Sequence, residues 1–140
     1  MRARLCKTLV AAVTAAVTVL ALAVSPAVAA PTTQRFACKY LITGKWPNGF
    51  RADLFIYNNG PALSTWTVRW WFADPTQVTS TWYAKITQGP AGSVTATPLA
   101  FFLPVDANET FSFGWSAIAA TTEVPKLIVV NGFLCDQPTI

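Results

Sequence analysis

The stretch TWTVRWWF, residues 65–72, has the clearest strand pattern in the chain. Large apolar side chains occupy every second position, while threonine, arginine and a further tryptophan lie between them. This period of two residues is typical of a β-strand with one buried face. The strand ends before Asp74 and Pro75, because proline has no N–H for the ladder. The residues assigned to the buried face are Trp66, Val68, Trp70 and Phe72.

The same alternation recurs in short runs on both sides of this stretch, and no helical period appears. Turn-forming residues, such as NNGP at 58–61, separate the runs. About eight or nine short strands with one apolar face predict an all-β fold, an antiparallel β-sandwich of immunoglobulin-like or jelly-roll-like type. We expect strands at residues 36–43, 50–58, 65–72, 77–87, 93–97, 99–103, 109–116 and 126–133.

The first 29 residues have the order of features found in a secretory signal peptide. Arg2, Arg4 and Lys7 precede an apolar run at residues 9–24, and small residues follow at 27–29. A retained membrane anchor is the alternative, but the apolar run is short for a bilayer span. We therefore expect residues 1–29 to be removed and residues 30–140 to form a single secreted domain.

Charge and composition exclude several classes of function. Residues 30–140 hold seven basic and six acidic side chains, a net charge of +1. The basic residues are scattered singly, which argues against a nucleic-acid surface. The chain has no histidine, which excludes a Ser-His-Asp triad and any metal site that needs imidazole. We expect no catalytic residues, no cofactor, no metal, no membrane contact after cleavage, and a monomer.

Two cysteines, Cys38 and Cys135, lie near the two ends of the expected domain. In an exported protein such a pair is expected to form a disulfide, and two free thiols are the alternative. A bridge that closes so long a loop contributes about 4–5 kcal/mol in the chain-entropy description. The bridge would therefore supply much of the stability of a domain of this size.

The aromatic residues, nine Phe, six Trp and three Tyr, are more than a thin sandwich buries. Phe111, Phe113 and Trp115 alternate as core residues do. Trp46 lies instead in the loop GKWPNG, residues 44–49, where no alternation is present. We expect its ring to be exposed and to meet a ligand, because an exposed tryptophan otherwise lowers solubility. The alternative is that the ring folds back over one end of the sandwich.

Several segments in register resemble a family 2 carbohydrate-binding module of the cellulose-binding type. The resemblance extends over nearly the whole expected domain and implies a β-sandwich with one end-to-end disulfide. It also implies binding to insoluble polysaccharide, cellulose first and chitin or xylan second, through aromatic rings on one flat face. The segments that carry it are Cys38, Trp46–Phe50, Asn58–Gly60, Trp66–Phe72, Gln77–Trp82, Phe113–Trp115 and Val130–Cys135.

The resemblance assigns the three binding rings to Trp46, Trp82 and Phe101. Phe101 stands where the family usually has tryptophan, and it could instead be a core residue of the run at 99–103. Xylan-binding relatives tend to carry arginine at the position of Gly49, which turns the neighbouring tryptophan out of plane. With Gly49, the resemblance implies that Trp46 lies flat, as a crystalline polysaccharide surface requires.

The orientation of Trp82 is open at this point. Strict alternation groups Trp82 with Val78 and Ile86, which would turn it inward, whereas the resemblance places it outside. A β-bulge near Ser80 would reconcile the two. Without a bulge, Tyr83 would be the exposed ring.

Three further side chains, Tyr83, Trp71 and Asn48, could add contacts to the same ligand. Trp71 faces outward by alternation, either on the face with the binding rings or on the opposite sheet. Together these features predict a non-catalytic polysaccharide-binding module.

Two alternatives for the function remain open. The first is a glycoside hydrolase, or an accessory fragment of a glycoside hydrolase system; for a hydrolase, Asp106 and Glu109 are the closest pair of carboxylates. A hydrolase needs two facing carboxylates at a set separation, and a surface loop is a poor place for them. The second alternative is a small secreted immunoglobulin-like carrier or inhibitor.

Overall fold

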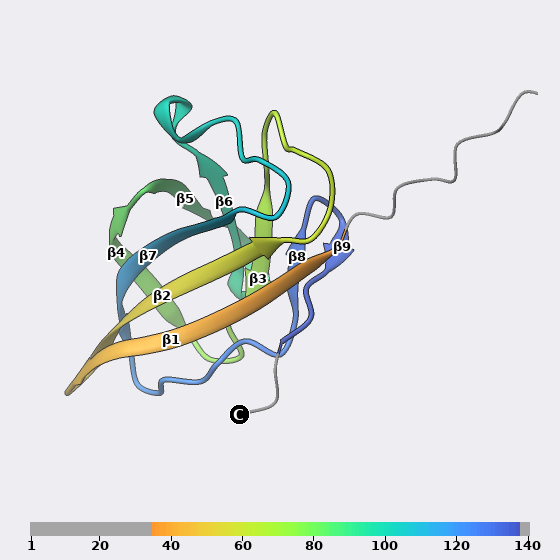
Figure 1. Cartoon of the computed structure of the whole chain (residues 1–140). Coiled ribbons are helices and arrows are strands. Elements are labelled where there is room, and N and C mark those ends of the chain that lie inside the picture. The colour runs from red at the N-terminus through yellow and green to blue at the C-terminus, as the bar shows by residue number, and fades with distance from the viewer. Residues whose placement is uncertain (1–34, 138–140) are drawn as a thin grey trace, which may run out of the picture. The chain divides into compact units, whose positions relative to one another are not determined.

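The computed structural model describes residues 35–137, which form nine strands in two antiparallel sheets (Figure 1). The predicted all-β sandwich is confirmed. The predicted signal peptide, residues 1–29, lies outside the described residues. Between residues 35 and 137, no helix has the length and apolar character needed to cross a bilayer.

The first sheet has the strand order β1-β2-β7-β4. β1 and β2 form a hairpin, and β2 lies beside β7 along nearly its whole length (Figure 1). The alternating sequence of β2 accounts for its place at the centre, because every second residue from Phe50 to Ile56 is buried. The bounds are β1 (Phe36–Trp46), β2 (Gly49–Asn58), β4 (Thr76–Trp82) and β7 (Thr110–Ala119).

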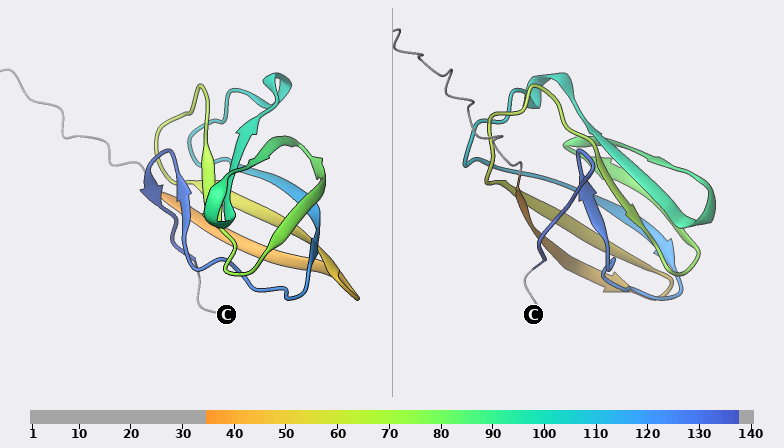
Figure 2. Two further views of the ribbon diagram at one scale, coloured as in Figure 1. Left: turned by 180° about the vertical axis from the view of Figure 1, so that it is seen from behind. Right: turned by 90° about the vertical axis from the view of Figure 1, so that its right-hand side faces the viewer.

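The second sheet has the order β5-β6-β3-β8-β9, and Figure 2 shows the two sheets as two layers. Its strands are short because turns and prolines interrupt the chain often. The strand bounds are β3 (Val68–Trp71), β5 (Ala84–Gln88), β6 (Ser93–Pro98), β8 (Ile128–Val130) and β9 (Phe133–Leu134). Two single-turn 3-10 helices accompany them, η1 (Pro90–Gly92) and η2 (Ala100–Phe102).

Aromatic rings from both sheets fill the space between the layers. Trp70 of β3 stacks on Trp115 of β7 with ring centroids 4.7 Å apart, and Trp66 stacks on Phe113 at 5.4 Å. All four rings are buried, as the alternation predicts. Such contacts contribute dispersion and apolar burial at the same time, so these rings join the two sheets.

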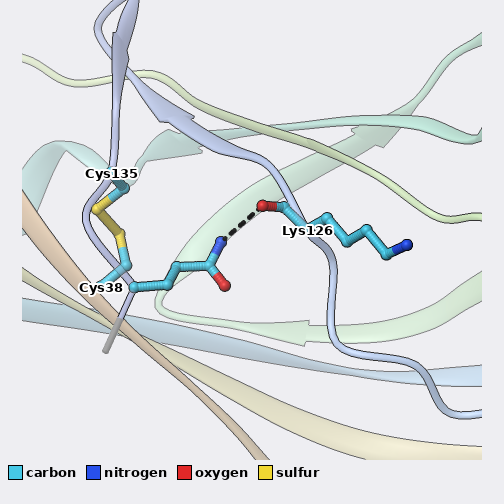
Figure 3. Close-up of a disulfide and its surroundings, with 4 residues drawn as sticks. Cys38, Lys126 and Cys135 are labelled. Atoms are coloured by element: carbon cyan, nitrogen blue, oxygen red, sulfur yellow. Dashed lines mark hydrogen bonds between the residues drawn. A yellow bond between two sulfur atoms is a disulfide. The ribbon is translucent and has the colours of Figure 1, made fainter. Parts of the chain in front are cut away.

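The disulfide between Cys38 and Cys135 is present, and its Cα atoms lie 5.7 Å apart (Figure 3). It joins β1 of the first sheet to the segment after β9 of the second sheet. Beside it, the amide of Gln137 donates a hydrogen bond to the carbonyl oxygen of Lys126 at 3.5 Å. The bridge therefore connects the edges of the two layers.

The structure corrects the strands predicted at residues 77–87 and 99–103. Residues 77–87 form two strands, because Tyr83 has a φ of 64° and the chain changes there from β4 of the first sheet to β5 of the second. Residues 99–103 form no strand; the 3-10 helix η2 occupies this run between Pro98 and Pro104. The run is apolar, but in the part of the chain that the structure describes it pairs with no strand.

The last predicted strand, residues 126–133, is also divided. Asn131 and Gly132 both have positive φ, 49° and 84°, and form a two-residue turn between β8 and β9. An Asn-Gly pair is well suited to such a hairpin turn.

Candidate functional site

The outer face of the first sheet carries the candidate site. The alternation that buries one set of β2 side chains turns the other set outward. Each outward residue of β2 lies opposite an outward residue of β7. The pairs, in order along β2, are Gly49–Ile118, Arg51–Ser116, Asp53–Gly114, Phe55–Ser112 and Tyr57–Thr110.

Trp46 is the last residue of β1 and pairs with Gly49 across the hairpin. Its side chain is 48% exposed. The indole lies directly against Gly49, since a Cβ atom added there would collide with its Nε1 atom. The missing side chain at position 49 therefore allows the ring to lie on the sheet while remaining open to solvent.

A β-bulge in β4 decides the orientation of Trp82. Val78 pairs with Ala117, but Ser80 pairs with Ser116, so Thr79 is an extra residue. The bulge shifts the alternation by one position. Trp82 therefore lies opposite Gly114 on the outer face, and the inward orientation that strict alternation predicts is not adopted.

Three neighbours hold the half-buried indole of Trp82 in place. Its Nε1 atom donates a hydrogen bond of 2.9 Å to Oδ1 of Asp53. The ring lies against Gly114, where an added Cβ would collide with it. The guanidinium carbon of Arg51 lies 5.1 Å from the ring centroid, within the range of a cation–π contact.

Asp53 also accepts a hydrogen bond of 3.2 Å from the hydroxyl of Thr43 on β1. Reasoning from the sequence missed Arg51, Asp53 and Gly114 as parts of the site. The alternation of residues 50–58 in the sequence could have identified Arg51 and Asp53 as outward-facing. Only the pairing of β2, β7 and β4 shows that they lie beside Trp82.

Trp46 and Trp82 therefore lie on the same face of the same sheet. The two rings lie beside Gly49 and Asp53. These residues are four positions apart along β2, which corresponds to about 13 Å. We call the outer face between Trp46 and Trp82 the aromatic strip. It is open, and its two principal rings rest on glycine backbone.

Phe101, the third predicted ring, lies in η2 and is 75% exposed. It is not a core residue. Its ring centroid lies 4.4 Å from that of Phe102, which contacts Tyr83 edge to face at 5.4 Å. We call Tyr83, Phe101 and Phe102 the aromatic cluster. Tyr83 directly follows Trp82 in the chain, so the cluster lies beyond the end of β4.

The other two predicted contacts lie in different places. Trp71 belongs to β3 of the second sheet, where it is 42% exposed and borders a hollow of about 280 Å³ with Val124 and Leu127. It does not join the aromatic strip. Asn48 lies in the β1–β2 turn beside Trp46, and its carbonyl oxygen accepts a hydrogen bond from Ala119 at 3.1 Å.

The two carboxylates considered for a hydrolase, Asp106 and Glu109, lie in the loop before β7. Glu109 accepts a hydrogen bond of 2.6 Å from the backbone N–H of Asp106, which closes the loop before β7. In the described range, no group of three or more His, Cys, Asp and Glu side chains could hold a metal ion.

The sequence profile of a family described as "Cellulose binding domain" matches residues 36–135. The chain is 30% identical over 112 residues to endoglucanase B of Cellvibrio japonicus, and the match covers 78% of the chain. It is 32% identical over 117 residues to chitinase C of Streptomyces lividans, with 83% of the chain covered. The chain spans 21% and 18%, respectively, of the lengths of these relatives.

Solved structures show the same architecture. The chitin-binding domain of Chi18aC from Streptomyces coelicolor has a TM-score of 0.63 and 29% identity, covering 73% of this chain and 95% of that domain. The cellulose-binding family 2 domain of ScLPMO10C has a TM-score of 0.52 at 24% identity, covering 66% of this chain and 90% of that one. The second likeness concerns the fold alone.

Proposed function

We propose that this chain, which belongs to the family of cellulose binding domains, adsorbs to cellulose or chitin through the aromatic strip and catalyses no reaction. The observation that carries the proposal is the position of Trp46 and Trp82 on one open face, each against a glycine. The two polysaccharides are suggested by the relatives, which include endoglucanases and chitinases.

The physical basis of binding is the match between flat rings and flat sugars. A β-1,4-linked chain presents C–H bonds on its ring faces and hydroxyl groups at its edges. An indole can cover the apolar face and leave the hydroxyl groups free for hydrogen bonds. Each ring that removes roughly 100 Å² from water contributes about 2.5 kcal/mol before the costs of association are subtracted.

The glycine beneath Trp46 favours a flat ligand surface over a twisted one. Any side chain at position 49 would push against the indole, and the family resemblance associates such a residue with xylan. Because Gly49 leaves room for the indole to lie against the backbone, we rank xylan behind cellulose and chitin. The proposal includes an extracellular location, which the leader-like residues 1–29 and the disulfide support.

The test is adsorption to microcrystalline cellulose, to crystalline chitin and to insoluble xylan. Trp46→Ala and Trp82→Ala should each lower the partition constant about tenfold or more on the preferred polysaccharide. Trp71→Ala is the matched control, because it removes an exposed tryptophan from the other sheet. Circular dichroism of each variant checks that it is folded.

The proposal predicts that the control binds as the wild type does. If Trp46→Ala and Trp82→Ala adsorb as the wild type does, the aromatic strip is not the binding site and the proposal is wrong. A loss that occurs only with Trp71→Ala would move the binding site to the second sheet.

A further inference from the structure

A groove of about 450 Å³ lies beside the first half of β7. β4 pairs with β7 only from Gly114 onward, so within residues 35–137 no strand lies beside the edge of β7 before Gly114 on that side. The aromatic cluster borders the space that a longer β4 would fill. We call this hollow the edge groove; its lining includes Tyr83, Phe101, Phe102, Thr110 and Ser112.

The edge groove continues the aromatic strip. Gly114 of β7 and Asp53 of β2 lie beside Trp82. Ser112 is the next outward-facing residue of β7 after Gly114 in the direction of the groove. Tyr83, in the wall of the groove, is the residue after Trp82. A ligand chain that leaves Trp82 along β7 therefore reaches the groove without crossing another element.

Aromatic rings lie on both sides of this path. Phe55 and Tyr57 of β2 are exposed and lie opposite Ser112 and Thr110. Side chains directly opposite in an antiparallel pair have Cβ atoms about 5 Å apart. The path beyond Trp82 therefore runs over the two hydroxyl side chains of β7, with the rings of β2 on one side and the aromatic cluster on the other.

This geometry differs from that of the aromatic strip in one respect. The strip is open and suits a flat surface, whereas the groove is a concave site with rings and polar groups. Besides Ser112 and Thr110, Glu109 belongs to its lining, and one oxygen of its carboxylate accepts a hydrogen bond from the backbone of Asp106. Such a combination fits one sugar chain, whose ring faces meet aromatic rings and whose hydroxyl groups find hydrogen-bond partners.

We infer that the edge groove, together with Tyr57, binds a single chain of the same β-1,4-linked polysaccharide. This inference rests on the proposed function, because the occupant is the chain that continues from the strip. The groove then contributes to binding of free chains, while Trp46 and Trp82 dominate adsorption to a crystalline surface.

The test compares soluble with crystalline ligands. Cellohexaose and chitohexaose are titrated into the protein by calorimetry, and adsorption to the two crystalline polysaccharides is measured in parallel. Phe102→Ala and Tyr57→Ala should each weaken hexasaccharide binding about fivefold or more, with less than a twofold change in adsorption. Trp46→Ala should instead weaken adsorption to the crystalline polysaccharide more than it weakens hexasaccharide binding. Phe133→Ala, an exposed phenylalanine on β9 of the second sheet, is the matched control.

Each outcome separates the inference from the proposed function. If the wild type adsorbs to a crystalline polysaccharide but binds neither hexasaccharide, the inference is wrong and the proposed function stands. The same holds if Phe102→Ala and Tyr57→Ala both bind hexasaccharide as the control does. If the protein binds hexasaccharide in a way that depends on Phe102 but does not adsorb to either crystalline polysaccharide, the inference about the edge groove is supported and adsorption through the aromatic strip is contradicted.

Discussion

Two glycines show how single residues shape the candidate site. Gly49 and Gly114 lie on neighbouring strands, and each has an indole in the space that a side chain would fill. The close approach of Trp46 and Trp82 to the backbone depends on the absence of a Cβ atom there. The orientation of each tryptophan is therefore determined as much by its glycine partner as by the tryptophan itself.

Tyr40 is a second residue with a distinct physical role. Its ring is buried against Trp115 at 5.5 Å, and its hydroxyl has no hydrogen-bond partner in the described part of the chain. Burial raises the pKa of this hydroxyl above its ordinary value of 10.0, because the low-dielectric core disfavours the phenolate.

Tyr40→Phe should stabilise the protein, by about 1 kcal/mol at neutral pH, because it removes a buried hydroxyl without a partner. The raised pKa adds a pH dependence. Above about pH 10 the unfolded chain can lose the phenol proton while the folded protein retains it, so the free energy of unfolding of the wild type is unaffected below about pH 10 and falls as the pH rises toward the raised pKa of Tyr40. The variant should therefore resist alkaline unfolding better than the wild type.

Urea unfolding at neutral pH and at a series of alkaline pH values measures both effects. Tyr83→Phe, which changes an exposed ring of the same type, is the control. An unfolding free energy of Tyr40→Phe at or below that of the wild type at every pH would contradict the prediction.

At the scale of elements, β4 combines an edge position with a bulge. Among the described strands, none follows β4 at its outer edge in the first sheet. Instead, the amide side chain of Gln88 on β5 accepts a hydrogen bond from the N–H of Val78 at 2.9 Å and donates one to the carbonyl oxygen of Thr76 at 2.7 Å. One side chain thus satisfies two backbone groups of an edge strand and ties the two sheets together.

Gln88→Ala should lower the free energy of unfolding by about 1–2 kcal/mol, because two hydrogen bonds to backbone are lost. Adsorption to the polysaccharide should weaken as well, since β4 positions Trp82. Lys85→Ala on the same strand is the control and should stay within about 0.5 kcal/mol of the wild type. Chemical denaturation and adsorption isotherms measure the two effects; wild-type values for Gln88→Ala in both would argue against this role.

At the scale of the whole described domain, the two sheets are joined by the buried aromatic rings and by one covalent bridge. The bridge spans 97 residues of sequence and connects the first strand to the segment after the last. A cross-link over so long a loop mainly restricts the unfolded chain. Its effect should therefore appear in stability more than in the geometry of the aromatic strip.

Replacement of both Cys38 and Cys135 by alanine should lower the free energy of unfolding by about 4–5 kcal/mol. Molecules that remain folded should still adsorb to the polysaccharide, because Trp46 and Trp82 are held by glycines and by Asp53 rather than by the bridge. Urea unfolding followed by tryptophan fluorescence measures the loss. The wild type in reductant provides the comparison, and a loss below about 1 kcal/mol would rule out this account.

Much of the fold was predictable because strand periodicity is a local property. The alternation of residues 65–72 and 109–116 identifies Trp66, Trp70, Phe113 and Trp115 as core residues, and all are buried. The cysteine pair was also predictable, because an exported domain favours a disulfide. The apolar run 99–103 was misleading, since its composition does not reveal that no strand lies beside it.

The sequence by itself determined the all-β class, the core faces of residues 65–72 and 109–116, the bridge and the exposed Trp46, because side-chain alternation and turn chemistry act over a few residues. Only the tertiary structure decided that Trp82 turns outward, that Trp71 belongs to the other sheet, and that Arg51, Asp53 and Gly114 surround Trp82. The physical reason is register. A single extra residue at Thr79 reverses the alternation of the residues that follow it in β4, and pairing between distant strands determines which neighbours those side chains meet.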